Sequence, residues 1–466
     1  MALLAAPLSA IPSQGPIAEG ASGKPNVVII LTDDQRFNQM WPFRHPQRAI
    51  QQDLLNKGIE FRRGYVVNPL CCPSRTSILT GDYSHTTGVW RDTPPYGGYQ
   101  TFHEGDESNT IATRLQSAGY TTGLFGKYLN GYADPALATG VVPPGWNQWM
   151  AFPRAGYTNY DLNVNGTIKH YTGDANYSTD VLGNAAANFI RTTPGPTFTY
   201  FAPYAPHNPA TPQLKYQNLY QGQLPEGQSP AFNERNVSDK PAYIRARVRL
   251  SGEEKAKLYE FRRDQVRSLR SVDDAVGTIF QALQDSGKLS NTLVFYLSDN
   301  GIQEGEHRWT SKRVPYEESI HVPFLVRYDP LTSDLAPGTR DTSHLVLNID
   351  IAPTIEQVAG IGPTPMDGMS LVPLLDGSAT SWRQKFLVEH LPRRDSQPPP
   401  AYCAVHTLNF IYVYYEDGEE ELYDLKRDQP ELTNVVTDPA YRSVRQRLHT
   451  ALRHMCVPPP PNMVVH

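Results

Sequence analysis

The chain has 466 residues, of which 39% are hydrophobic and 19% charged, and its formal net charge at pH 7 is −5. This composition is typical of a globular protein that is long enough for one large domain and a smaller one. The acidic balance argues against nucleic acid or an anionic membrane as a partner, and no apolar run in the sequence approaches the roughly 18 residues of a membrane span.

Residues 1–25 are expected to form a leader. An apolar stretch is followed there by a segment rich in Pro, Gly and Ser, as at the end of a signal peptide, but no basic residue precedes the stretch. A disordered leader has the same composition, so both interpretations stay open. A signal remnant predicts a secreted or extracytoplasmic protein, and a cytoplasmic location is the alternative.

The segment 26–375 is predicted to alternate between strands and helices. Short apolar runs typical of strands buried on both faces occur at 26–31, 121–125, 197–201, 292–297 and 322–327. Helical patterns lie between them at 111–118 and 252–284. This alternation predicts an α/β fold, with a large mixed, mostly parallel sheet flanked by helices.

The last segment, residues 376–466, has a different character. Strands are predicted at 386–389, 410–415 and 421–425, and a helix at 442–454. Asp417-Gly418 between two of these strands is typical of a hairpin turn. We therefore predict a C-terminal α+β subdomain, a small antiparallel sheet with one packed helix.

Polar residues follow three of the predicted buried strands. They are Asp33-Asp34, His207 and Asp299-Asn300. Because ligands of open α/β sheets bind outside the carboxyl ends of the strands, these segments are expected to meet at one site. Carboxylates with a side-chain amide favour calcium or magnesium over zinc. A single Asp after a strand is more often a helix N-cap or turn residue, so only the convergence argues for a metal site.

The chain has four cysteines. Cys403 and Cys456 either pair and staple the C-terminal region or are both free and buried. Cys71 and Cys72 are adjacent, and adjacent cysteines rarely bridge to each other, so this pair needs another explanation.

That explanation comes from the string Cys71-Cys72-Pro73-Ser74-Arg75, followed by Leu79-Thr80-Gly81. It resembles the signature of the formylglycine-dependent sulfatases. The resemblance implies that Cys71, and not Cys72, is oxidised to Cα-formylglycine by a formylglycine-generating enzyme. An ordinary helix start would account for Pro73 but not for the whole string.

The resemblance extends from about residue 26 to 440 and implies an alkaline-phosphatase-like fold. Further segments that resemble the family are 26–35, 297–301, 312–323, 350–354, 367–368 and 421–425. Two others, Gly126-Lys127-Tyr128-Leu129-Asn130 and 142–146, are similar to the N-acetylglucosamine-6-sulfatases and extracellular heparan endosulfatases.

The resemblance also implies a site. The metal ligands would be Asp33, Asp34, Asp299, Asn300 and the formylglycine from Cys71, around a calcium ion, with magnesium as the alternative. Arg75, Lys127, Lys312 and His207 would be catalytic. Lys127 and Lys312 would bind sulfate, and His207, which would also contact the substrate, or Lys312 would protonate the leaving oxygen. His307 is a further candidate for contact with substrate. Leu129 stands where many sulfatases have a histidine, so His85 is predicted as the base.

The expected reaction is hydrolysis of sulfate esters, on sulfated sugars or aryl sulfates, to an alcohol and inorganic sulfate. One rival is a phosphonate or phosphate ester hydrolase of the same superfamily, which would share the sheet and metal residues. The other is a non-catalytic binding protein on the same fold. Loss of Cys71, Arg75 or a metal ligand would favour that second rival, and all are present.

Overall fold

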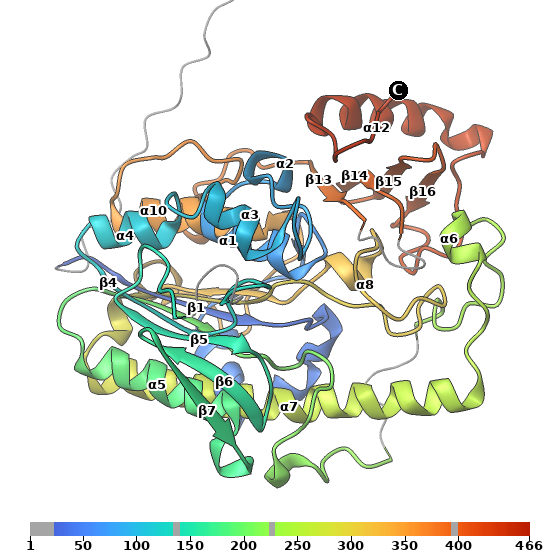
Figure 1. Ribbon diagram of the computed structural model, residues 1–466. Coiled ribbons are helices and arrows are strands. Elements are labelled where there is room, and N and C mark those ends of the chain that lie inside the picture. The colour runs from blue at the N-terminus through green and yellow to red at the C-terminus, as the bar shows by residue number, and fades with distance from the viewer. Residues whose placement is uncertain (1–22, 134–139, 223–228, 393–398) are drawn as a thin grey trace, which may run out of the picture.

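A computed structural model describes residues 23–133, 140–222, 229–392 and 399–466. The expected leader, residues 1–25, therefore lies almost entirely outside the described residues. Two sheets dominate the structure, a large one and a small C-terminal one (Figure 1). Among the described residues, no helix is both long enough and apolar enough to cross a bilayer.

The large sheet has ten strands in the order β11-β2-β10-β9-β1-β8-β4-β5-β6-β7. In chain order these are β1 (Asn26–Thr32), β2 (Ile59–Phe61), β4 (Thr121–Gly126), β5 (Gln148–Arg154), β6 (Asn159–Val164), β7 (Thr167–Thr172), β8 (Thr197–Ala202), β9 (Thr292–Ser298), β10 (Phe324–Arg327) and β11 (Arg340–Asp341). The central strands β9, β1, β8, β4 and β5 run parallel. The predicted mixed α/β sheet is thus confirmed.

The run predicted as a strand at 322–327 begins later, at Phe324, and pairs antiparallel with β9. Its apolar sequence correctly indicated burial on both faces, but burial does not fix strand direction. The chain leaves the sheet at the carboxyl end of β9. Because β10 runs antiparallel to β9, the chain re-enters the sheet beside β9 at that same end. The intervening segment, 299–323, is therefore held at both ends beside the centre of the sheet.

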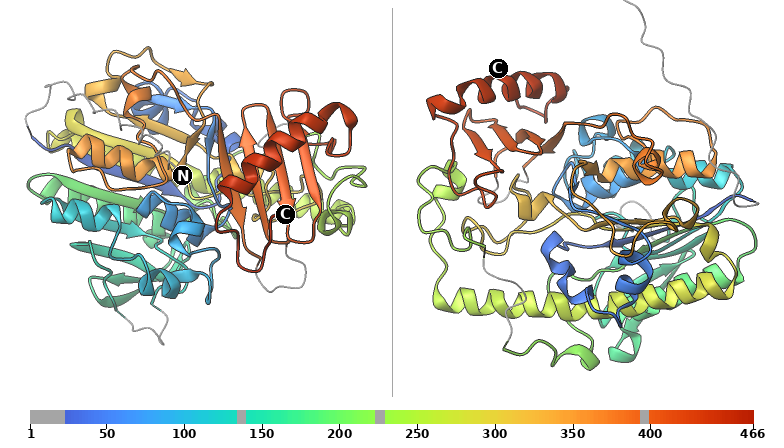
Figure 2. Two further views of the ribbon diagram at one scale, coloured as in Figure 1. Left: turned by 90° about the horizontal axis from the view of Figure 1, so that it is seen from above. Right: turned by 180° about the vertical axis from the view of Figure 1, so that it is seen from behind.

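Helices cover both faces of the large sheet (Figures 1 and 2). On one face lie α5 (Ser178–Thr192) and α7 (Gly252–Asp285), and on the other α1 (Cys71–Thr80), α4 (Ile111–Ser117) and α10 (Ile351–Ala359). Side chains of β1 alternate between two hydrophobic clusters: Val27, Ile29 and Leu31 join one, and Val28 and Ile30 the other. Double-sided burial explains why β1 reads as a continuous apolar run.

Smaller elements complete this part of the chain. They are α2 (Ser84–Thr87), α3 (Gly98–Glu104), α6 (Ala242–Arg245), α8 (Glu317–Ile320), α9 (Asp329–Thr332), α11 (Val372–Leu375) and the paired short strands β3 (Gly64–Tyr65) and β12 (Val346–Leu347). The long helix α7 begins at a capping box, in which Ser251 and Glu254 bond each other's backbone N–H groups.

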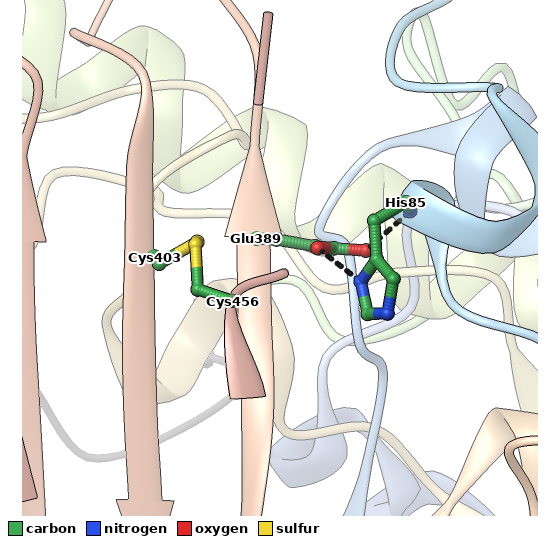
Figure 3. The surroundings of a disulfide bond; sticks show 4 residues. All are labelled: His85, Glu389, Cys403 and Cys456. Carbon is green, nitrogen blue, oxygen red and sulfur yellow. Dashed lines mark hydrogen bonds and ion pairs between the residues drawn. A yellow bond between two sulfur atoms is a disulfide. The ribbon is translucent and has the colours of Figure 1, made fainter. Parts of the chain in front are cut away.

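The C-terminal sheet has four antiparallel strands, β13 (Lys385–His390), β14 (Tyr402–Thr407), β15 (Phe410–Tyr415) and β16 (Glu420–Asp424). Helix α12 (Arg442–Met455) packs across it (Figure 2). Gly418, with φ +84°, makes the predicted turn between β15 and β16. Strand β14 was not among the strands predicted from the sequence. A disulfide joins Cys403 of β14 to Cys456 after α12, which settles the alternatives left open for these cysteines (Figure 3).

Candidate active site

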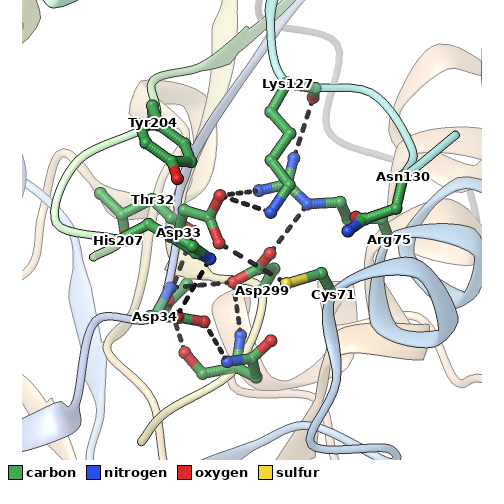
Figure 4. A network of polar contacts seen from close by, with 12 residues as sticks. Thr32, Asp33, Asp34, Cys71, Arg75, Lys127, Asn130, Tyr204, His207 and Asp299 are labelled. Carbon is green, nitrogen blue, oxygen red and sulfur yellow. Dashed lines mark hydrogen bonds and ion pairs between the residues drawn. The ribbon is translucent and has the colours of Figure 1, made fainter. Parts of the chain in front are cut away.

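The carboxyl ends of four strands supply polar side chains to one place, as Figure 4 shows. Asp33 and Asp34 follow β1, Asp299 follows β9, Lys127 follows β4 and His207 lies beyond β8. Parallel strands end at the same edge of a sheet, so these segments meet although they are far apart in sequence. The convergence expected from the sequence is present.

Helix α1 contributes the cysteine and the arginine of the motif. Cys71 is the first residue of α1, and Arg75 follows one turn later on the same side. Both side chains are buried. Arg75 donates from Nε to Asp299 Oδ2 at 2.8 Å and from Nη1 to the Lys127 carbonyl oxygen at 2.9 Å. The guanidinium therefore ties α1 to the ends of β9 and β4.

Gly126 sets the direction in which the chain leaves β4. Its φ is +129°, and a Cβ added there would lie 1.9 Å from the Ala202 carbonyl oxygen in the neighbouring strand. Only glycine allows this conformation and approach. The turn places Lys127 next, with its Nζ 2.6 Å from Asp33 Oδ2.

Two lysines bring positive charge into the network. Lys127 bonds Asp33, and Lys312 Nζ lies 2.6 Å from Asp34 Oδ1 and 2.7 Å from Cys71 Sγ. Burial disfavours each ammonium, but the neighbouring carboxylates outweigh it and raise the pKa of both lysines. Both side chains are therefore cationic at neutral pH.

The carboxylates stay ionised for the reciprocal reason. Burial alone would raise the pKa of Asp33, but Lys127 and the other nearby cations outweigh it, and the pKa lies below its usual value. Burial would likewise raise the pKa of Asp34, but the nearby cations outweigh burial and lower the pKa, and Lys312 contributes most among them. Burial raises the pKa of the Cys71 thiol well above its usual value, so the unmodified thiol is protonated at neutral pH.

The donor set fits a hard divalent cation. Asn300 Oδ1 is buried without a hydrogen-bond partner, while its Nδ2 donates to Asp34 Oδ1 at 2.6 Å. A buried acceptor oxygen beside carboxylates is what an oxygen-seeking cation would engage. One potential ligand atom from each of Asp33, Asp34, Cys71 and His207 lies within 4.8 Å of the others. Of the sequence-predicted ligands, Asp299 is the most engaged by hydrogen bonds, accepting three.

His207 has one ring nitrogen directed at this group. Its Nδ1 lies 2.8 Å from the Asn208 carbonyl oxygen, which can only accept, so Nδ1 carries a proton. Nε2 lies 3.6 Å from Asp34 Oδ2. The ring stacks on Tyr204 with 4.7 Å between centroids. Nε2 is thus held where it can exchange a proton with a bound molecule.

His85, predicted as a base, lies elsewhere. Its Nδ1 is 2.9 Å from Glu389 Oε2, and its backbone N–H donates to the same carboxylate (Figure 3). Glu389 belongs to β13, so the pair joins α2 to the C-terminal sheet. The histidine contributes no described contact to the network around Cys71. We therefore assign it a structural contact and no longer propose it as the base.

His307, predicted to touch substrate, is fully buried. Its Nδ1 lies 2.7 Å from Glu234 Oε2, and its ring packs on Tyr316. A ring with no exposed surface cannot reach a sugar. His307 instead anchors the segment 299–323 that carries Lys312.

Two residues near the network were not predicted as site residues, Tyr204 and Asn130, although Asn130 ends the Gly126–Asn130 motif (Figure 4). Tyr204 precedes His207 by three positions, and Asn130 follows Lys127 by three. Proximity in sequence to predicted site residues was the available signal.

The comparisons with known proteins agree with this geometry. The profile of the sulfatase family matches residues 25–361, nearly three quarters of the chain. The chain belongs to the sulfatase family. It is a sulfuric ester hydrolase, as expected from the Cys71 motif. A second profile, the C-terminal region of N-sulphoglucosamine sulphohydrolase, matches residues 305–457 of this sulfatase.

Relatives with assigned activities match most of the sulfatase. The N-acetylglucosamine-6-sulfatase of Capra hircus is 33% identical over 465 residues, covering 90% of this chain and 81% of the relative. The human N-acetylglucosamine-6-sulfatase is also 33% identical, covering 88% and 81%. An extracellular sulfatase SULF-1 homologue of Drosophila melanogaster is 33% identical and covers 80% of this chain but 34% of its own.

Solved structures share the fold. One is of a protein in complex with its substrate D-glucosamine-2-N,6-O-disulfate; its TM-score is 0.80 at 23% identity, covering 93% of this chain and 98% of its own. Another is the phosphonate monoester hydrolase of Agrobacterium radiobacter, with a TM-score of 0.74 at 20% identity, covering 93% and 96%. Sulfatases and phosphonate hydrolases thus share one architecture, and fold similarity alone does not separate them.

Proposed function

We propose that this sulfatase removes sulfate from the 6-position of glucosamine-type sugars, through a nucleophile made by oxidising Cys71 to formylglycine. The observation that carries the reaction is the position of Cys71, whose sulfur lies 2.7 Å from Lys312 Nζ and 3.7 Å from Asp33 Oδ1. The sugar class rests on the N-acetylglucosamine-6-sulfatases at 33% identity.

Cys71 itself is a poor nucleophile here, because burial keeps its thiol protonated. A formylglycine hydrate at this position supplies a hydroxyl nucleophile and, through its second hydroxyl, a route to release sulfate. A formylglycine-generating enzyme is the partner that such a modification requires.

The surrounding side chains divide the remaining tasks. Lys127 and Lys312 are cations that bind the sulfate oxygens and offset the charge that develops on them. Arg75 holds Asp299 and the end of β4 in position. His207 Nε2 delivers a proton to the leaving sugar oxygen, with Nδ1 fixed by Asn208.

Asp33, Asp34, Asp299 and Asn300 would hold a calcium ion together with the modified Cys71. When bound, the cation lowers the pKa of the nucleophilic hydroxyl and polarises sulfate oxygens. The buried Asn300 Oδ1, which has no hydrogen-bond partner, supports this assignment. Calcium tolerates irregular oxygen cages better than magnesium, which demands near-octahedral geometry.

We further propose an extracytoplasmic location and a division into a catalytic domain, residues 26–375, and a C-terminal subdomain, residues 376–466. The disulfide between Cys403 and Cys456 supports the location, since such bonds persist in oxidising compartments. Relatives named as extracellular sulfatases support it as well.

The test compares N-acetylglucosamine-6-sulfate, 4-nitrophenyl sulfate, and the matching aryl phosphate and phosphonate as substrates of wild type and Cys71→Ala. We expect turnover of both sulfates, lost in the variant, and an aldehyde mass for the Cys71 peptide. Cleavage of phosphonate in preference to sulfate, with the aldehyde present, would overturn the proposal. Turnover of the aryl sulfate alone would support the proposed sulfatase reaction but contradict the proposed sugar substrate.

A further inference from the structure

The second cysteine of the motif has a defined partner that the sulfate chemistry does not explain. Cys72 is fully buried, and its thiol faces Asn130 in the loop after β4. The Asn130 backbone N–H donates to Cys72 Sγ at 3.0 Å, and the thiol lies 3.6 Å from Asn130 Oδ1 as its donor. Cys72 thus holds Asn130 by both its backbone and its side chain.

This pairing fixes which end of the amide faces Cys72. Because Oδ1 accepts from the thiol, the opposite end, Nδ2, is turned away from Cys72. Asn130 is partly exposed, whereas Lys127, Tyr128 and Leu129 before it are buried. Asn130 contacts Cys72, the residue that follows Cys71, and Figure 4 shows its side chain directed toward the polar network. The chain therefore reaches the surface next to the nucleophile position with an amide donor.

The neighbouring loop supports the same arrangement. Leu70, the N-cap residue of α1, offers no side-chain acceptor, and Asp92 Oδ1 instead accepts the Cys72 backbone N–H at 2.9 Å. The Asn130 carbonyl oxygen accepts from the Tyr99 backbone N–H at 2.8 Å. Asn130 is thus held from both sides, so its amide is preorganised and need not be ordered when substrate binds.

We propose that Asn130 is a specificity-determining residue whose Nδ2 donates a hydrogen bond to a hydroxyl or ring oxygen of the sugar that bears the sulfate, and that Cys72 is the residue that positions it. The inference rests on the proposed function. An aryl sulfate has no such oxygen beside the ester, so the contact separates sugar sulfates from aryl sulfates.

The experiment measures kcat/KM for N-acetylglucosamine-6-sulfate and 4-nitrophenyl sulfate in wild type, Asn130→Ala, Cys72→Ala and Cys72→Ser. Loss of one neutral hydrogen bond corresponds to about five- to tenfold, so we expect the sugar-to-aryl ratio to fall by that factor in Asn130→Ala. Cys72→Ala should lower the ratio less, and Cys72→Ser, which retains a donor, should restore most of it. Asn188→Ala, an exposed change on α5, is the matched control and should leave the ratio unchanged.

A double variant, Asn130→Ala with Cys72→Ala, should match Asn130→Ala alone, because Cys72 acts through the amide. If Asn130→Ala does not fold, Asn130→Ser replaces it, since its hydroxyl is too short to make the same contact. An unchanged ratio, or equal losses on both substrates, would overturn the inference while leaving the proposed function intact. Wild type that cleaves no sugar sulfate would reject the proposed function and the inference with it.

Discussion

Lys312 Nζ lies 2.6 Å from Asp34 Oδ1 and 2.7 Å from Cys71 Sγ, so one ammonium group bridges the proposed metal ligand Asp34 and the proposed nucleophile position. Burial disfavours the charged form of this lysine, but Asp34 and the other acidic groups around it together outweigh burial and raise its pKa, so the lysine is charged at neutral pH.

Lys312→Ala removes this bridge. We expect kcat for an aryl sulfate to fall by about 100- to 1,000-fold, as when a single preorganised stabilising donor is lost. Lys257→Ala, at an exposed lysine of α7, is the control and should retain full activity. A loss of less than about tenfold for Lys312→Ala would show that Lys127 alone suffices.

Calcium should stabilise the folded protein through Asn300. A ligand at 100 times its Kd adds about 2.7 kcal/mol to the free energy of unfolding, so calcium should raise the melting temperature of wild type and a chelator should reverse it. Asn300→Ala removes the buried Oδ1 and should lose most of this response. An identical calcium response in wild type and variant would exclude Asn300 as a ligand.

The interaction between His85 of α2 and Glu389 of β13 is expected to stabilise the fold in a pH-dependent manner. Burial lowers the pKa of His85, but the hydrogen bond and charge of Glu389, together with the nearby Asp367 and Asp82, outweigh burial, so the pKa in the folded state lies above the usual 6.5. The pair's contribution is therefore fully present below pH 6.5 and is lost as pH rises through the folded-state pKa.

The measurement is the melting temperature of wild type and His85→Gln between pH 5.5 and 8.5. The difference between them should be larger at the acidic end. His45→Gln, at an exposed histidine, serves as control. A difference that grows toward alkaline pH would contradict the assignment.

The Cys403–Cys456 disulfide closes a loop with a sequence separation of 53. Loop-closure entropy of that length corresponds to about 4 kcal/mol. Replacing both cysteines by Ala, since both are buried, should lower the urea midpoint and make stability insensitive to reducing agent. Wild type should lose stability under reduction. Equal urea midpoints for wild type and the double variant, both measured without reducing agent, would contradict the expectation.

The parts of the structure that were predictable are those with a local signal. Strands such as β1 and β9 are buried on both faces, so their apolar runs stand out, and Asp33 and Asp299 could be placed at their ends. Strand β7 is largely exposed and lacks an apolar pattern, so it was missed. The partners of the two misplaced histidines lie far away in sequence: Glu389 is 304 residues from His85, and Glu234 is 73 from His307. No local pattern reveals such pairs.

The burial of Cys71 also has a consequence in time. Lys312, which lies against its sulfur, is 241 residues further along the chain. At about 5–20 residues per second, a ribosome needs about 12–50 s to make that stretch. During this interval Cys71 has been synthesised but the residue that closes over it does not exist. An enzyme that oxidises Cys71, as the proposed function requires, would therefore meet an accessible cysteine for tens of seconds in each round of synthesis and a buried one afterwards.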